Sequence, residues 1–147
     1  MQAGGGGPGG AGRAVVVHVD GGARGNPGPA AIGAVVLDPA TNPPTRLATV
    51  SERIGVTTNN VAEYRAVIAA LEAARSFTAR TVRVRCDSML VIRQLQGAWR
   101  VKQPHLRPLF EQARALLAAY EVVDLAHVPR EDNTDADLLV NAALDQA

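Results

Sequence analysis

The spacing of hydrophobic residues changes near residue 60, and this change divides the chain into two kinds of pattern. Before it, three short runs rich in β-branched residues are separated by Gly, Pro and Asn, as in strands joined by turns. The runs are AVVVHVD (14–20), AAIGAVVLD (30–38) and RLATVSERI (46–54). We predict that they form an antiparallel meander. The first run is predicted to end at Asp20, with the following GGARGNPGP as a turn.

After residue 60, helical and strand patterns alternate. Apolar residues recur at helical spacing over 60–76, whereas TVRVRCD (81–87) alternates strictly between apolar and polar positions and predicts a strand. The remaining predicted elements are helices over 88–97, 105–119 and 133–146, a strand over 121–128 and a loop over 129–132. The order βββαβααβα predicts an α/β fold in which helices pack on a mixed five-stranded sheet.

The composition is that of one ordinary domain. The chain has 147 residues, of which 47% are hydrophobic and 20% charged, and its net charge is +1. A disordered chain is excluded, because it would need low hydrophobicity and high net charge. The charge also excludes a strongly basic coat protein. Residues 1–13 are Gly-rich and predict a flexible leader, which leaves 14–147 as the folded domain.

The cysteine and aromatic content indicate the cellular compartment and limit the kinds of ligand that the protein can bind. Cys86 is the single cysteine, so no intramolecular disulfide can form, and we expect a reducing, cytoplasmic compartment. We interpret Cys86 as a small strand hydrophobe whose side chain points away from the face of Asp87. No apolar run is long enough for a membrane span, and the N-terminus lacks the features of a secretory signal. Aromatic residues make up 3%, which argues against a stacking platform for single strands.

Four acidic residues are predicted to converge on one site. Asp20 and Asp87 end two strands, which lie side by side if those strands are parallel neighbours, while Glu63 and Asp137 lie in the first turns of helices. Each has a local alternative: Asn60–Glu63 resembles a capping box, and Asp87-Ser88 could cap the next helix. Four clustered carboxylates, however, need raised pKa values or a cation. Mg²⁺ suits such oxygen ligands, and two ions about 3.5–4 Å apart can hold the attacking water and the leaving oxygen of a phosphodiester.

Around these acids the chain resembles ribonuclease H of type 1. The resemblance is carried by DGGARGNPGPAAIGAVV, TTNNVAEYRAVIAALEAA, VRCDSMLVIRQLQGAWRVK and HVPREDNTDADLLVNAALD, which occur in the family's order over residues 14–146. The closest subgroup is the compact bacterial and archaeal form without a long basic protrusion. The resemblance implies the ribonuclease H-like fold and a two-metal endonuclease that uses Mg²⁺ or Mn²⁺. Its implied action is to cut the RNA strand of RNA–DNA hybrids, leaving 3′-hydroxyl and 5′-phosphate ends. The implied catalytic and metal-binding residues are Asp20, Glu63, Asp87 and Asp137.

The resemblance also implies a surface for the hybrid duplex. Three asparagines match positions in the minor groove, where the 2′-hydroxyl distinguishes RNA from DNA. Thr58 matches a position that holds a DNA phosphate, and Trp99 with its neighbouring cations matches the region that touches the DNA strand. The implied substrate-binding residues are Gly21, Gly22, Arg24, Asn26, Thr58, Asn59, Asn60, Ser88, Trp99, Lys102 and Asn133. Structural alternatives are a turn for Asn26, a helix cap for Asn59 and closure of the core edge by Trp99.

Two residues compete for an auxiliary catalytic role. His127 lies six residues before Asn133, which matches the spacing of a histidine that assists product release or proton transfer in some family members. Arg130 occupies the short loop and is the alternative. Asp135 is the alternative metal ligand to Asp137.

Two rival functions are weighed against hybrid cleavage. One is another enzyme on the same fold, such as a DEDD-type exonuclease or an integrase-like strand transferase, against which the groove asparagines argue. The other is a hybrid-binding module without catalysis, against which the complete set of four acids argues. We expect a monomer with no obligatory protein partner. The chain could be a whole protein or the N-terminal domain of a larger one that also carries a phosphatase-like domain.

Overall fold

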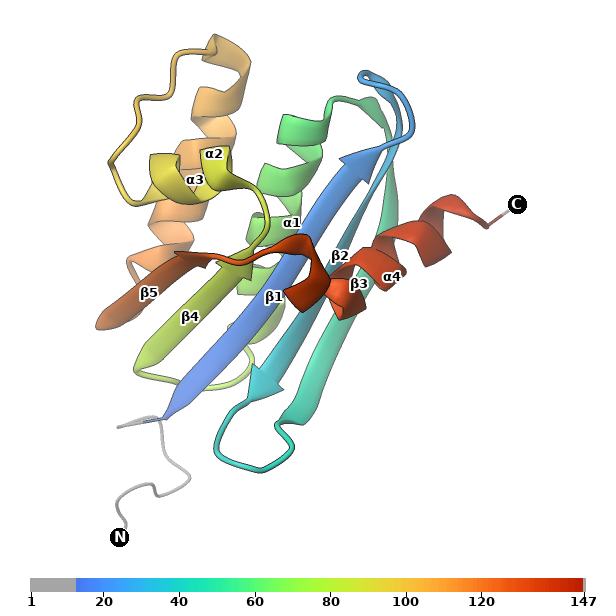
Figure 1. Cartoon of the computed structure of the whole chain (residues 1–147). Helices are drawn as coiled ribbons and strands as arrows, with labels where there is room; N and C mark the ends of the chain where they lie inside the picture. Colours follow the sequence, from blue (N-terminus) through green and yellow to red (C-terminus); the bar gives the residue numbers. More distant parts are fainter. Residues whose placement is uncertain (1–12, 147) are drawn as a thin grey trace, which may run out of the picture.

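A mixed five-stranded sheet forms the centre of the fold (Figure 1). The computed structural model describes residues 13–146, so the predicted leader lies outside the described residues except for Arg13. The strands are β1 (Ala14–Ala23), β2 (Gly28–Asp38), β3 (Thr45–Thr57), β4 (Thr81–Cys86) and β5 (Val122–His127), and their order in the sheet is β3-β2-β1-β4-β5. β1 pairs antiparallel with β2 and parallel with β4. The predicted meander and mixed sheet are therefore confirmed.

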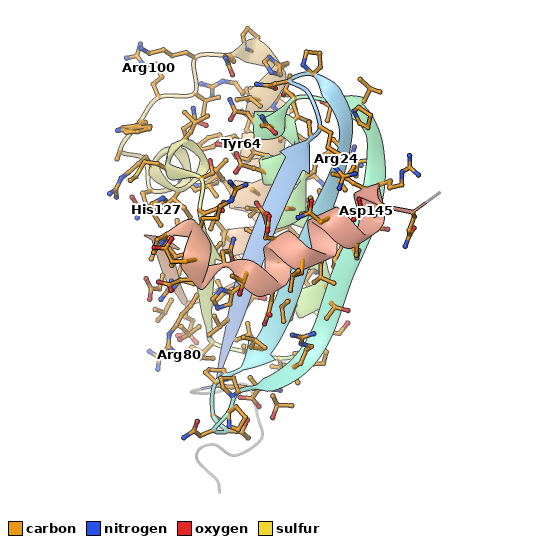
Figure 2. All side chains as sticks on the ribbon, turned by 45° about the vertical axis from the view of Figure 1, so that its right-hand side comes forward. Arg24, Tyr64, Arg80, Arg100, His127 and Asp145 are labelled. Atoms are coloured by element: carbon orange, nitrogen blue, oxygen red, sulfur yellow. The ribbon has the colours of Figure 1, made fainter. Side chains whose placement is uncertain are left out.

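Helices cover both faces of this sheet. α1 (Asn59–Ala74) packs on β1 and β2, with α3 (Arg107–Leu117) against it, while α4 (Thr134–Leu144) crosses the opposite face (Figures 1 and 2). α2 (Met89–Leu95) follows β4, and short 3-10 turns precede α3 and α4. The predicted order of elements is confirmed. Within residues 13–146, no helix is long and apolar enough to cross a bilayer.

The first strand extends further than the sequence predicted. Asp20 does not end it, because Gly21, Gly22 and Ala23 continue the ladder opposite Ala30–Ile32 of β2. The glycine-rich segment therefore contributes three residues to a strand before the chain turns. This correction matters for the site, since it places Asp20 inside a strand that is paired with β2 both before and after it.

The two faces of the sheet are packed differently. The main core lies under α1 and α3 and contains the large, fully buried side chains of Tyr64, Leu71, Ile92 and Leu106. The face under α4 is covered by a small cluster built mostly from short side chains, Ala31, Val140 and Ala143 with Leu144 at its edge. Because these side chains are short, α4 lies close to the sheet.

Candidate active site

Four structural elements bring the four predicted acids to one cavity. Asp20 comes from β1, Glu63 from α1, Asp87 from the residue after β4, and Asp137 from the first turn of α4. All four line a cavity of about 360 Å³ at the carboxyl ends of β1 and β4. The predicted convergence is therefore present in the structure, and each acid comes from a different part of the chain.

Helix caps beside the acids leave two carboxylates available. The cap of α1 is Thr58, whose Oγ1 accepts a hydrogen bond from the Val61 amide at 3.3 Å, and not Asn60 as the capping-box alternative required. Glu63 therefore lies beyond the first turn and is not used in capping. Ser88 caps α2 through a 3.3 Å bond from the Val91 amide, so Asp87 is not used there either.

Glycines at two contacts allow the acid-bearing helices to approach the sheet. A Cβ atom on Gly21 would overlap the carbonyl of Ala62, the residue before Glu63. A Cβ atom on Gly33 would overlap the carbonyl of Ala136, the residue before Asp137, and would lie 2.9 Å from the Val140 nitrogen. Any larger residue at either position would push a helix, and its acid, away from Asp20.

Burial raises the pKa values of three carboxyl groups in the site, those of Asp20, Glu63 and Asp87. Burial and the neighbouring Asp87 raise the pKa of Asp20 to about 8, and Asp137 adds to this shift. Burial raises the pKa of Glu63 to about 7 against the opposing effect of a hydrogen bond from Ser88. Burial also raises the pKa of Asp87. Closely spaced, desolvated carboxylates of this kind fit a hard divalent cation that replaces their protons.

Both candidates for the auxiliary role lie near the acids. Arg130 lines the cavity, and its charge lowers the pKa values of Glu63 and Asp87 against the effect of burial. His127 ends β5 with its side chain exposed and exerts a smaller effect of the same sign on Asp87. Asp135 instead pairs with Arg46 at 3.2 Å, so its carboxylate is engaged outside the cavity.

Cys86 lies closer to the acids than the sequence indicated. Its side chain is fully buried with the core valines, as predicted, yet its sulfur lies within 4.8 Å of carboxylate oxygens of Glu63 and Asp87. The Ser88 amide donates to this sulfur at 3.4 Å. Burial raises the pKa of the Cys86 thiol, which keeps it neutral and leaves oxygen atoms as the charged donors.

The predicted groove asparagines stiffen the turn beside the cavity. Asn59 Oδ1 accepts a hydrogen bond from the Ala23 amide at 2.8 Å, and the Asn59 amide donates to Asn26 Oδ1 at 3.1 Å. These bonds tie the end of β1 and the glycine-rich turn to the start of α1. The turn alternative for Asn26 is thus realised, whereas Asn59 does not cap α1, because Thr58 does, and Asn59 lines the cavity.

Arg24 extends from the same turn across the mouth of the cavity. Its Nη2 atom lies 2.6 Å from Asp145 Oδ1 and 3.4 Å from Asn141 Oδ1, at the far end of α4 (Figure 2). The C-terminal end of α4 therefore forms one wall of the site. Sequence reasoning did not assign a role to Asn141 or Asp145, since nothing local marks them as neighbours of Arg24.

A second cavity lies beside α2, at some of the residues predicted to contact DNA. Its volume is about 500 Å³, and Asn60, Trp99, Arg100 and Lys102 are among its lining residues. Trp99 is 46% exposed and does not close the core edge. The segment that carries it is held from below by Gln94, which donates to the Arg100 carbonyl at 3.3 Å and accepts from the buried Tyr64 hydroxyl at 2.6 Å.

Two predicted substrate-binding residues are buried. Asn133 is only 1% exposed, and its Nδ2 atom donates to the Val19 carbonyl at 2.7 Å. Its side chain is directed at β1 in the interior, and contact between Asn133 and substrate stays a prediction. Ser88 is likewise buried and serves as the cap of α2.

Gly33, which sequence reasoning missed, was hidden as one small residue within the apolar run of β2.

Comparison with known sequences gives one consistent set of relatives. The model of a family described as reverse transcriptase-like matches residues 18–143. The Ribonuclease HI of Halobacterium salinarum is 46% identical over 133 residues, which cover 90% of this chain and 65% of the relative. The Bifunctional protein Rv2228c of Mycobacterium tuberculosis is 47% identical over 133 residues, which cover 90% of this chain and 36% of the relative. The chain thus spans between 36% and 65% of the length of these two curated relatives.

Solved structures give the same picture. The N-terminal RNase H domain of Rv2228c superposes with a TM-score of 0.85 at 47% identity, covering 90% of this chain and 99% of that one. RNase H1 of Halobacterium salinarum also gives 0.85, at 46% identity, with coverage of 91% and 99%. LC11-RNase H1, solved in complex with an RNA/DNA hybrid, gives 0.81 at 43% identity, with coverage of 89% and 96%. The range matched by the family model contains all four acids of the cavity.

Proposed function

Because the chain belongs to the ribonuclease H family, in its type 1 branch, we propose that it cuts the RNA strand of RNA–DNA hybrids internally. The observation that carries this proposal is the convergence of Asp20, Glu63, Asp87 and Asp137 on one cavity. The relative solved with an RNA/DNA hybrid supports the choice of substrate. The products would carry 3′-hydroxyl and 5′-phosphate ends.

The four carboxylates are proposed to hold the divalent cations. Two Mg²⁺ or Mn²⁺ ions held by Asp20, Glu63, Asp87 and Asp137 would lower the pKa of the attacking water and stabilise the negative charge that develops on the leaving oxygen. Asp20 and Glu63, whose pKa values lie near 8 and 7, must lose their protons to act as ligands. Metal binding at neutral pH is therefore expected to release protons from this site.

The RNA strand would lie along the glycine-rich turn. Asn26 and Asn59 use their Oδ1 atoms to fix the turn, and among the described residues their Nδ2 groups have no hydrogen-bond partner. Each Nδ2 group can donate to a 2′-hydroxyl or a base edge in the minor groove. The bonds that fix the turn hold these donors in place before substrate arrives, which reduces the ordering cost of binding.

The DNA strand is assigned to the second cavity. The exposed ring of Trp99 offers a flat apolar surface, and Lys102 offers a charge for a phosphate. Thr58, two residues before Asn60 in the chain, offers a hydroxyl. These contacts sit beside Asn60 and α2. A duplex held there and at the acids is gripped on both strands, which favours a hybrid over a single strand.

For the auxiliary role we favour Arg130 over His127. Arg130 lines the cavity and is the larger cationic influence on Asp87. Its permanent charge would attract the scissile phosphate and counter the repulsion of the acids.

A monomeric state and a cytoplasmic location stay predictions, to be checked by light scattering and cell fractionation.

The test is cleavage of a labelled hybrid with Mg²⁺ or Mn²⁺. Wild type should cut the RNA internally in the hybrid and leave matched RNA–RNA and DNA–DNA duplexes intact, while Asp87→Asn should be inactive. Asp124→Asn is the matched control, because Asp124 is an aspartate of β5 that pairs with Arg85 outside the cavity. Binding without cleavage under both metals would refute the enzyme, and cleavage from one end only would indicate an exonuclease.

A further inference from the structure

The buried amide of Asn133 connects the two elements that carry Asp20 and Asp137. Its Nδ2 atom donates at 2.7 Å to the carbonyl of Val19, the residue directly before Asp20. Its own carbonyl accepts the Asp137 amide at 3.1 Å. Asn133 therefore bonds both to the residue before Asp20 and to the backbone of Asp137.

The orientation of this amide is unusual for its position. Asn133 is the residue at the cap of α4, where an asparagine side chain commonly accepts a hydrogen bond from the first turn. Here the side chain makes no such bond and is turned toward β1. The sequence thus uses an efficient capping residue for a contact between elements.

The Oδ1 atom of Asn133 faces a small cavity that His18 also lines. Asn133 is 1% exposed, and its Oδ1 is the one buried side-chain atom among the described residues without a regular hydrogen-bond partner. A cavity of about 80 Å³ lies against it, and His18 borders the same cavity. Burial lowers the pKa of His18, and its interaction with the Asn133 side chain offsets part of that shift.

His18 is placed to hold this amide in its orientation. It lies two residues before Asp20 in β1, so both side chains project on the α4 face of the sheet. A ring N–H can donate to Oδ1 directly or through a water molecule in the cavity, because an oxygen with nothing to accept is costly to bury. The opposite orientation would turn the amide NH₂ away from Val19.

We propose that Asn133 is a positioning residue that sets the separation of Asp20 and Asp137, and that His18 holds its amide in place. The inference rests on the proposed function, since it assigns the spacing of two acids to their role as ligands. In this role neither residue needs to touch the substrate. Loss of a residue that orients ligands typically lowers metal affinity or activity roughly 10–100-fold.

The experiment compares the loss of two hydrogen bonds that connect α4 and its cap to the sheet. Asn133→Ala and Asn133→Ser are set against Ser51→Ala, which removes the 2.7 Å bond from Ser51 Oγ to the Leu139 carbonyl and so loosens α4 from β3. We expect both Asn133 variants to lower kcat and Mn²⁺ affinity, measured by calorimetry, roughly 10–100-fold with little change in KM for the hybrid. Ser51→Ala should change stability alone. The serine variant protects the test if the alanine variant does not fold.

His18 is tested by rescue. His18→Phe keeps the ring volume without a donor and should lower Mn²⁺ affinity, whereas His18→Gln restores a donor and should recover much of it. Combined with Asn133→Ala, His18→Phe should add little, because both act through one amide. Equal Mn²⁺ affinities for the Asn133 variants and Ser51→Ala would overturn the inference. A wild type that binds Mn²⁺ but cuts no hybrid would instead refute the proposed function, while the calorimetric comparison would still test the spacing.

Discussion

Replacing Gly33 with alanine should uncouple α4 from the site while leaving the sheet intact. The new Cβ atom would overlap the Ala136 carbonyl and lie 2.9 Å from the Val140 nitrogen, where ordinary contact begins at 3.4 Å. The helix must move outward by at least the half-ångström that Val140 requires, and further to clear the carbonyl. Since a misplacement of about 1 Å can cost roughly 100-fold in rate, we expect kcat on the hybrid to fall by about that factor. Overpacking should also cost about 1–3 kcal/mol of unfolding free energy.

A matched core variant separates the loss of geometry from the loss of stability. Val36→Ala lies in the same strand but faces the main core, and deletion of its buried methyl groups should cost about 2 kcal/mol. Urea unfolding and steady-state cleavage are measured on both variants at a temperature where both are folded. If Gly33→Ala retains the kcat of Val36→Ala, the argument that close packing at Gly33 places Asp137 is wrong.

Three further predictions concern pH, the core and the substrate surface. Because Asp20 and Glu63 have pKa values of about 8 and 7 when folded, against ordinary values of 3.8 and 4.5, the metal-free folded state binds more protons than the unfolded state. The free energy of unfolding should therefore fall as pH rises from about 4 to about 8. Added Mg²⁺ should make the protein more stable with rising pH above neutrality. Thermal melts in EDTA with no pH dependence would contradict the raised pKa values of Asp20 and Glu63. Tyr64→Phe removes the 2.6 Å bond to Gln94 and should lower the free energy of unfolding by about 1–3 kcal/mol in urea titrations. Lys102→Ala should weaken hybrid binding for all sequences and reduce the slope of log affinity against log salt by about one; an unchanged slope would remove Lys102 from the phosphate contacts.

The helices, the strands and the convergence of the four acids could be predicted because they depend on local hydrophobic spacing and on the pairing of two strands. Strict alternation over 81–87 and helical spacing over 60–76 identify a strand and a helix without knowledge of the rest of the chain. The parallel pairing of β1 with β4 then places Asp20 near Asp87 through simple sheet geometry. The residue types and their order made the common site predictable before any distance was known.

What the sequence missed depends on contacts between distant segments. Nothing local shows that Gly21 and Gly22 continue a ladder, since their extended backbone is stabilised only by β2. An Asn before a helix suggests a cap or a surface contact, and only the position of Val19 shows why Asn133 turns inward. The proximity of Cys86 to Glu63 likewise follows from how closely α1 approaches the sheet at Gly21.

Because α4 packs shallowly on the sheet, the active site should be lost on heating before the core of the protein unfolds. The helix rests on a cluster of mostly small side chains, and its outer contacts include exposed ion pairs of Arg24 with Asp145 and Arg46 with Asp135. Exposed pairs contribute about 0–1 kcal/mol each. Detachment of this last helix therefore requires less free energy than melting of the sheet, and its amides should exchange with solvent through subglobal opening. On heating, Asp137 would leave the site while the other three acids stay in place, so activity would be lost in a reversible transition below the melting of the core.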